Sequence, residues 1–160
     1  MEESKTIGII FKYDTPENFE LLKKYVSYLK DFKKKIKVFG FFDMKEVPGK
    51  LAYSKVEFEF FTKKDLNWYG RPGGVYIQNF IEEERDILID LNIHDSIPLK
   101  FIAAKTNARF KIGKLNEENK KYFDMLITFD PAKNFKFFLA QADTYLLMIN
   151  KKEFPDAKPF

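Results

Sequence analysis

RDILIDL, residues 85–91, predicts a short buried strand that contains an acidic residue near its end. A helical segment follows it, and KIG at residues 111–113 marks the end of a second strand, which stops at a glycine. A strand, a helix and a strand in this order form a βαβ unit, whose two strands run parallel. Ligands of open α/β sheets bind where such strands end. The segment therefore predicts a fold class and a place for a ligand, but it predicts no reaction.

Strands alternate with helices along the rest of the chain. The predicted strands cover residues 6–13, 36–42, 56–60, 86–91, 108–112 and 123–129, and the predicted helices cover 16–33, 75–84, 96–107 and 134–149. The third strand alternates apolar and charged residues, with Val56, Phe58 and Phe60 as its apolar side, so we place it near a sheet edge. We expect one Rossmann-like three-layer α/β domain over residues 1–150, with a mainly parallel sheet of about five to six strands and helices on both faces. The tail, residues 151–160, is expected to be frayed.

The composition is that of a soluble globular protein. Of the 160 residues, 45% are hydrophobic and 32% are charged. No apolar run reaches the roughly 18 to 20 residues that cross a bilayer, and the N-terminus does not read as a secretory signal. Cysteine is absent, which excludes disulfides and thiolate chemistry. We therefore expect a cytoplasmic protein without a membrane partner.

The net charge of +4 raises the possibility of a nucleic-acid partner. However, only Arg71, Arg85 and Arg109 are arginines, and arginine is the residue that binds phosphate and guanine with two parallel hydrogen bonds. The lysines, together with abundant Phe, Ile and Asn, also match the codons of an A/T-rich genome. Both readings of the lysine excess stay open.

Several catalytic site types are excluded. His94 is the only histidine, so a histidine-rich metal site is impossible. No serine lies in a Gly-x-Ser-x-Gly elbow, and both the phosphate-binding loop and the dinucleotide fingerprint are missing. We predict no cofactor, no resident metal and no catalytic residue.

Three acidic residues mark a candidate ligand crevice. Asp14, Asp90 and Asp130 each close or follow an apolar strand. In parallel neighbouring strands they would line one rim of the sheet, where carboxylates could bind a hard cation such as Mg²⁺. Alternatively, each aspartate only caps a turn or a helix start.

The break at residues 63–74 is the candidate contact loop. It contains Asn67, Trp68, Tyr69 and Arg71 next to several glycines. Tryptophan, tyrosine and arginine dominate interface hot spots, and loops carry function more often than scaffold elements do. The alternative is that Trp68 folds back as a lid on the core.

A basic alternating face surrounds the fifth strand. It comprises Lys105, Asn107, Arg109, Lys111 and Lys114 and would suit a phosphate group. The same pattern is typical of the solvated side of an edge strand.

Four segments carry a family resemblance: DILIDL at 86–91, PLKFIAAKTNARFKIG at 98–113, FDMLI at 123–127 and NWYG at 67–70. The chain, from about residue 36 to 149, resembles a family of small bacterial proteins of unknown function. This resemblance implies a bacterial cytoplasmic protein and no activity. The outline of residues 86–90 and 111–113 is also similar to the N-terminal half of heptosyltransferase-type glycosyltransferases. The glycine-rich loop after the first strand and a nucleotide-sugar donor domain are missing, so this similarity implies the fold without the transferase activity.

We predict a non-enzymatic binding or scaffold module that meets a protein or RNA partner through the Trp68 loop and the face around Arg109 and Lys111. The alternative is a degenerate or partner-dependent enzyme that binds a phosphorylated small molecule or a nucleotide in the crevice of Asp14, Asp90 and Asp130. The sequence predicts neither the partner nor the oligomeric state.

Overall fold

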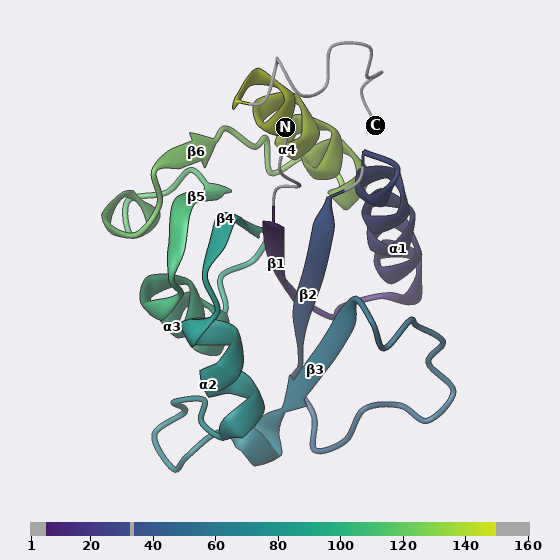
Figure 1. The fold of residues 1–160 in the computed structure, drawn as a ribbon, viewed down its shortest axis with the longest axis vertical. Coiled ribbons are helices and arrows are strands. Elements are labelled where there is room, and N and C mark those ends of the chain that lie inside the picture. Colours follow the sequence, from purple (N-terminus) through teal and green to yellow (C-terminus); the bar gives the residue numbers. More distant parts are fainter. Residues whose placement is uncertain (1–5, 33, 150–160) are drawn as a thin grey trace.

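A single parallel sheet organises the chain. The computed structural model describes residues 6–32 and 34–149. Its strands are β1 (Thr6–Lys12), β2 (Lys35–Phe42), β3 (Phe58–Thr62), β4 (Arg85–Asp90), β5 (Ala108–Lys114) and β6 (Met125–Ile127). They form a six-stranded sheet in the order β3-β2-β1-β4-β5-β6, and every pairing is parallel (Figure 1). This is the strand order of a doubly wound Rossmann-like sheet. The order in which successive strands are added reverses between β1 and β4, which are themselves parallel. The predicted fold class is confirmed.

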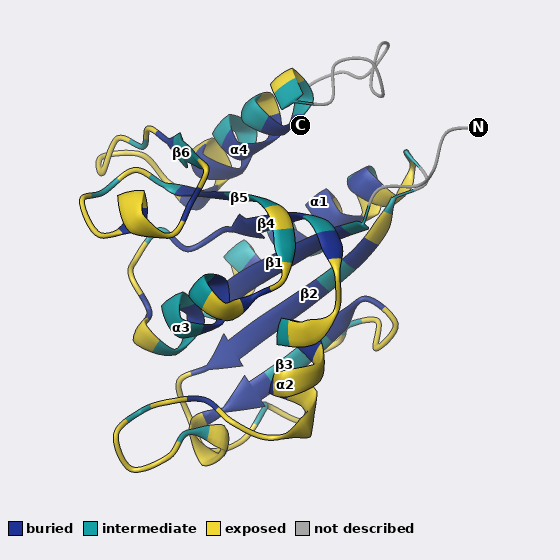
Figure 2. Cartoon of the chain, turned by 60° about the vertical axis from the view of Figure 1, so that its left-hand side comes forward, coloured by how far each residue is buried: buried dark blue, intermediate teal, exposed yellow. Residues whose placement is uncertain are grey.

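Helices cover both faces of the sheet. One face is covered by α1 (Pro16–Lys30) and α4 (Phe135–Ile149), and the other by α2 (Val75–Glu82) and α3 (Ile97–Lys105). Alternate residues along a strand point to opposite faces, so the same strands supply two separate cores. Ile9 and Ile89 pack under α1 and α4, whereas Ile10 and Leu88 pack under α2 and α3. Figure 2 shows the buried central strands between these layers.

The start of α1 shows how the sequence sets a helix boundary. Thr15 caps the helix by accepting a hydrogen bond from the Asn18 N–H over 3.1 Å, and Pro16 occupies the first turn, where its missing N–H costs nothing. Phe19 and Leu22 then recur at helical spacing and are buried. The helix therefore starts where the sequence predicts.

The two edge strands differ from their predicted ranges: β3 is shifted by two residues and β6 is shorter. β3 was expected at residues 56–60, but a turn closed by the hydrogen bond from the Phe58 N–H to the Ser54 carbonyl delays its start. This turn leaves Val56 80% exposed and buries Glu57, so the predicted alternation is wrong there. β6 is shorter than the predicted 123–129 because it pairs only with the last three residues of β5.

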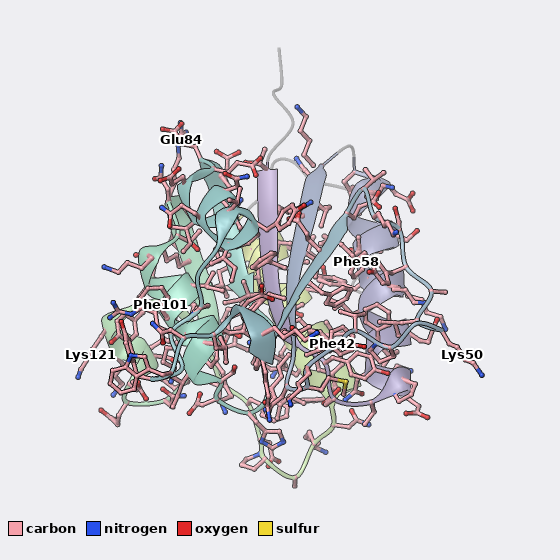
Figure 3. All side chains as sticks on the ribbon, turned by 90° about the horizontal axis from the view of Figure 1, so that it is seen from below. Phe42, Lys50, Phe58, Glu84, Phe101 and Lys121 are labelled. Carbon is pink, nitrogen blue, oxygen red and sulfur yellow. The ribbon has the colours of Figure 1, made fainter. Side chains whose placement is uncertain are left out.

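Cavities lie at both ends of the sheet, one at the amino ends of β1 and β4 and one at their carboxyl ends. Figure 3 shows Glu84, just before β4, beyond one end of the central strands, and Phe42, the last residue of β2, towards their other end. Within the described residues, no helix is long and apolar enough to span a bilayer. The tail 151–160, predicted to be frayed, lies outside the described residues.

Candidate functional site

The loop between β3 and α2 is a closed turn. The Oδ1 atom of Asn67 accepts hydrogen bonds from the backbone N–H groups of Tyr69, at 3.2 Å, and Arg71, at 2.8 Å. The backbone N–H of Asn67 donates to the Arg71 carbonyl over 2.9 Å, and Leu66 and Pro72 form an antiparallel bridge outside them. Gly70 has a φ of 83°, which residues with a Cβ rarely adopt. The sequence of this segment thus specifies one conformation.

Trp68 stands at the tip of this turn, away from the core. Its side chain is 93% exposed, and its ring meets the exposed Tyr69 ring edge-on with 4.8 Å between centroids. Trp68 therefore buries little of its ring against its own fold.

Arg71 connects this turn to α3. Its guanidinium carbon lies 5.6 Å from the centre of the Tyr69 ring and 4.9 Å from the centre of the Phe101 ring. Phe101 in turn lines an open cavity of about 280 Å³ beside Ile97, which is itself exposed. We call Trp68, Tyr69, Arg71, Ile97 and Phe101 together the Trp68 surface.

Sequence reasoning missed the α3 part of this surface. The helical spacing of residues 97–105 puts Leu99, Ile102 and Ala103 on one stripe, and the structure buries all three. Ile97 and Phe101 lie off that stripe, and an apolar residue off the buried stripe of an amphipathic helix is the signal that could have found them.

The predicted crevice acid Asp90 is buried at the carboxyl end of β4. Its Oδ1 accepts hydrogen bonds from the backbone N–H of Asn92, at 3.0 Å, and from Asn92 Nδ2. Asn92 Oδ1 accepts a hydrogen bond from the backbone N–H of Lys12 at 2.6 Å. This hydrogen bond links the end of β4 to the end of β1, where the strand order of the sheet reverses. Burial raises the pKa of Asp90 to about 7, although the Asn92 hydrogen bonds and the charge of Lys100 oppose the rise and Asp95 adds to it.

The other two predicted crevice acids form local turns. Asp14 is exposed and accepts from the Thr15 N–H and from Asn18 Nδ2, while Asp130 is exposed and accepts from the Ala132 N–H. Within residues 6–32 and 34–149, no three His, Cys, Asp or Glu side chains are grouped so that they could hold a metal ion. The side-chain hydrogen bonds of Asp14 and Asp130 thus reach no further than four residues along the chain, as in turns.

A small cavity of about 80 Å³ lies where β1 and β4 end. It is lined by Lys12, Asp14, Asn92, His94 and Phe135, among others. Asp90 points to the opposite face, because Ile89 and Leu91 on either side of it pack under α1 and α4. Ligand pockets usually measure about 300–1,000 Å³, so this cavity admits a few atoms and no nucleotide.

Three of the four cations of the predicted basic face contact their own chain. Lys111 Nζ donates to the Ala103 carbonyl at 2.8 Å in the last turn of α3, and its burial lowers the pKa of this lysine. Lys114 Nζ donates to the Ile93 carbonyl, and Arg109 lies 3.7 Å from Asp86. Lys105 is exposed at the end of α3. β5 is not the edge strand of the sheet, because β6 pairs with it, but this pairing covers only Ile112–Lys114, so the part of β5 that carries Arg109 is open on that side.

Comparison with known proteins identifies the family of the chain. No curated protein and no solved structure is significantly similar to it. A family described as of unknown function, DUF6913, matches residues 1–149, which is nearly the whole chain and all of the sheet. The protein is therefore a member of this family of unknown function, DUF6913.

Proposed function

We propose that this protein is a non-enzymatic binding module that docks on a protein partner through the Trp68 surface. One observation carries the proposal: Trp68 is 93% exposed on a turn that Asn67 holds in one conformation. A turn that is already ordered loses little entropy on binding, so a partner gains most of the energy of burying the tryptophan.

The composition of the surface favours a protein partner. Tryptophan, tyrosine and arginine are the residues enriched at interface hot spots, and here Trp68, Tyr69 and Arg71 are adjacent. Ile97 and Phe101 add an apolar cavity of about 280 Å³ that could admit a partner side chain.

RNA fits this surface less well. Asp95 and Glu118 line the same cavity together with Lys100, which lies 3.4 Å and 3.0 Å from their carboxylates, so the lining leaves no unpaired cation for a phosphate backbone. Lys111 and Lys114 donate their ammonium hydrogens to the carbonyls of Ala103 and Ile93 of their own chain. We therefore infer that these two lysines would contribute less to a phosphate contact than free surface cations would.

Affinity capture with matched variants tests this function. The tagged wild-type protein should retain a specific protein from a lysate of its own organism, and Trp68→Ala should lose it. Val56→Ala is the control, because Val56 is also highly exposed but lies in the turn before β3. Nuclease treatment of the lysate should leave the captured protein in place. Capture that survives Trp68→Ala, or that nuclease abolishes, contradicts the proposal.

A second candidate rests on Asp90. A buried carboxyl group with a pKa of about 7 exchanges its proton near neutral pH, as acid–base groups of enzymes do. This favours the alternative of a degenerate or partner-dependent enzyme that binds a phosphorylated small molecule or nucleotide at the carboxyl ends of the strands. The strand-end cavity is small and Asp90 does not line it, so this candidate ranks second. A rise in melting temperature with nucleotides or sugar phosphates, with and without Mg²⁺, would support it.

A further inference from the structure

Arg85 is a charged side chain enclosed by the fold. Its side chain is 3% exposed, and its guanidinium carbon lies 3.9 Å from the centre of the Phe80 ring of α2. A Cβ atom at Gly8 on the neighbouring β1 would lie only 2.7 Å from Arg85 Cδ. The glycine therefore makes room for the arginine, and the two strands are fitted around it.

The charge of Arg85 is incompletely paired. Nη2 lies 3.4 Å from the carboxylate of Glu83, which is a long contact to an exposed side chain. Nη1 is buried and has no hydrogen-bond partner among the described residues. A buried cation without a full set of acceptors is costly, and burial accordingly lowers the pKa of Arg85. An anion at this place would offset that cost.

Two adjoining cavities offer space for such an anion. One, of about 210 Å³, is lined by Thr6, Glu84, Arg85, Asp86, Asn107 and Arg109. The other, of about 170 Å³, is lined by Thr6, Arg85 and Glu83 together with Lys35 and Lys37. Thr6 and Arg85 line both, so the guanidinium lies between two hollows at the amino ends of β1 and β4, of which the second is also lined by Ile7 and Ile36.

Two carboxylates, those of Glu84 and Asp86, line the larger cavity, and the carboxylate of Asp86 already has partners in the chain. Asp86 Oδ2 accepts the Thr6 N–H at 3.1 Å, and Asp86 Oδ1 lies 3.7 Å from Arg109. Arg109 is well exposed, so it can turn from Asp86 towards a bound anion without breaking the core. Asn107 adds an amide donor on the same wall.

We propose that this amino-end cleft binds a phosphate-sized oxyanion, which takes the place of Glu83 on Arg85 and is held from the other side by Arg109 and Asn107. Guanidinium groups suit this task, because they form two parallel hydrogen bonds to phosphate oxygens. The site lies at the opposite end of the strands from the strand-end cavity, and it is independent of the Trp68 surface.

Titration with inorganic phosphate tests the site. The full chain is titrated at constant ionic strength, with chloride as the reference, and its melting temperature and NMR spectrum are followed. Phosphate should raise the melting temperature above the chloride reference, because a ligand of the native state stabilises it. The largest shifts should be at the amides of Thr6 and Asn107. No shift with phosphate, or the same shift with chloride, overturns the proposal.

Matched variants locate the effect. Arg109→Gln changes an exposed residue and should weaken phosphate binding by about tenfold, which corresponds to the loss of one charge-assisted contact. Arg71→Gln, at an arginine outside both cavities, should bind like the wild type. Glu2 and Glu3 lie within a few residues of Thr6, so Glu2→Gln/Glu3→Gln is a further variant that must bind phosphate. Equal binding by the Arg109 and Arg71 variants, or loss of binding in the Glu2/Glu3 variant, contradicts the site.

Discussion

The guanidinium of Arg71 lies over the ring of Phe101, with 4.9 Å from its carbon to the ring centre, and thereby ties the turn after β3 to the helix after β4. Because Arg71 also lies over Tyr69, whose ring Trp68 meets edge-on, these contacts connect the exposed Trp68 to α3. A cation between two rings is stabilised by the negative faces of both. Two segments that are distant in the sequence thus form one contact surface.

Trp68→Ala should leave the stability of the fold almost unchanged. The side chain is exposed, and exposed substitutions change the free energy of unfolding by no more than about 0.5 kcal/mol. Phe80→Ala, at a buried ring of α2, should cost roughly 3 to 5 kcal/mol in the same urea titration. Emission of Trp68 should be red-shifted and quenched by iodide. A blue-shifted maximum with a large loss of stability in Trp68→Ala would place the tryptophan in the core.

Stability should fall as the pH rises through the titration of Asp90. Its folded pKa of about 7 lies above the ordinary value of 3.8, so the folded state binds this proton more tightly than the unfolded state. The resulting stabilisation is complete below about pH 4 and is lost by about pH 7, with a range of up to about 4 kcal/mol. Asp90→Asn should remove this component, and urea titrations at pH 5 and pH 8 measure it. The same pH dependence in wild type and variant would show that Asp90 is not the group.

Tyr25 and Tyr28 provide a matched pair around one buried acid. Tyr25 is buried and donates to Asp143 over 3.2 Å, whereas Tyr28 is less buried and donates over 3.4 Å. Tyr25→Phe removes a donor from a carboxylate inside the α1–α4 contact, which should cost about 1–3 kcal/mol. Tyr28→Phe should cost less, because water can replace its hydroxyl. Thermal unfolding of the two variants measures this difference, and an equal loss of stability in Tyr25→Phe and Tyr28→Phe would contradict it.

Gly40 should not tolerate a methyl group. A Cβ atom there would lie 2.4 Å from the Phe60 ring, which Phe42 and Tyr53 already contact edge-on. Gly40→Ala should therefore cost about 1–3 kcal/mol through overpacking. Gly49→Ala is the control, since a Cβ at Gly49 meets nothing within 4 Å. A Gly40 variant as stable as the control would mean that Phe60 moves freely.

Most of the fold could be predicted because its signals are local. A few consecutive residues are enough to predict each of three elements: the apolar runs predict β1 and β4, and the capping residue predicts the start of α1. The edge strand β3 was placed two residues early, because Val56 and Glu57 fit a strand pattern that the turn to Ser54 overrides. This hydrogen bond joins residues only four apart, but a single turn of this kind leaves no periodicity in the sequence.

The sites depended on contacts between distant segments. The exposure of Trp68 follows from its glycine-rich surroundings, but the pairing of Arg71 with Phe101 needs the position of α3. Arg85 reads as an ordinary charge at the start of a strand, and only the register of β1 against β4 brings it onto Gly8 and under Phe80. A glycine inside the apolar β1 was the one local sign of such a close approach.

Photo-crosslinking from the tip of the loop tests the central claim most directly. Trp68 is replaced by the photoreactive p-benzoyl-phenylalanine in cells of the source organism, and Val56, also highly exposed, is replaced in a parallel culture. The account predicts a discrete crosslinked protein species from position 68 that is absent from position 56. The aromatic replacement preserves a ring on the turn, so failure cannot be attributed to loss of the contact residue. No crosslink from position 68, or the same species from both positions, would contradict a partner-binding role for the Trp68 surface.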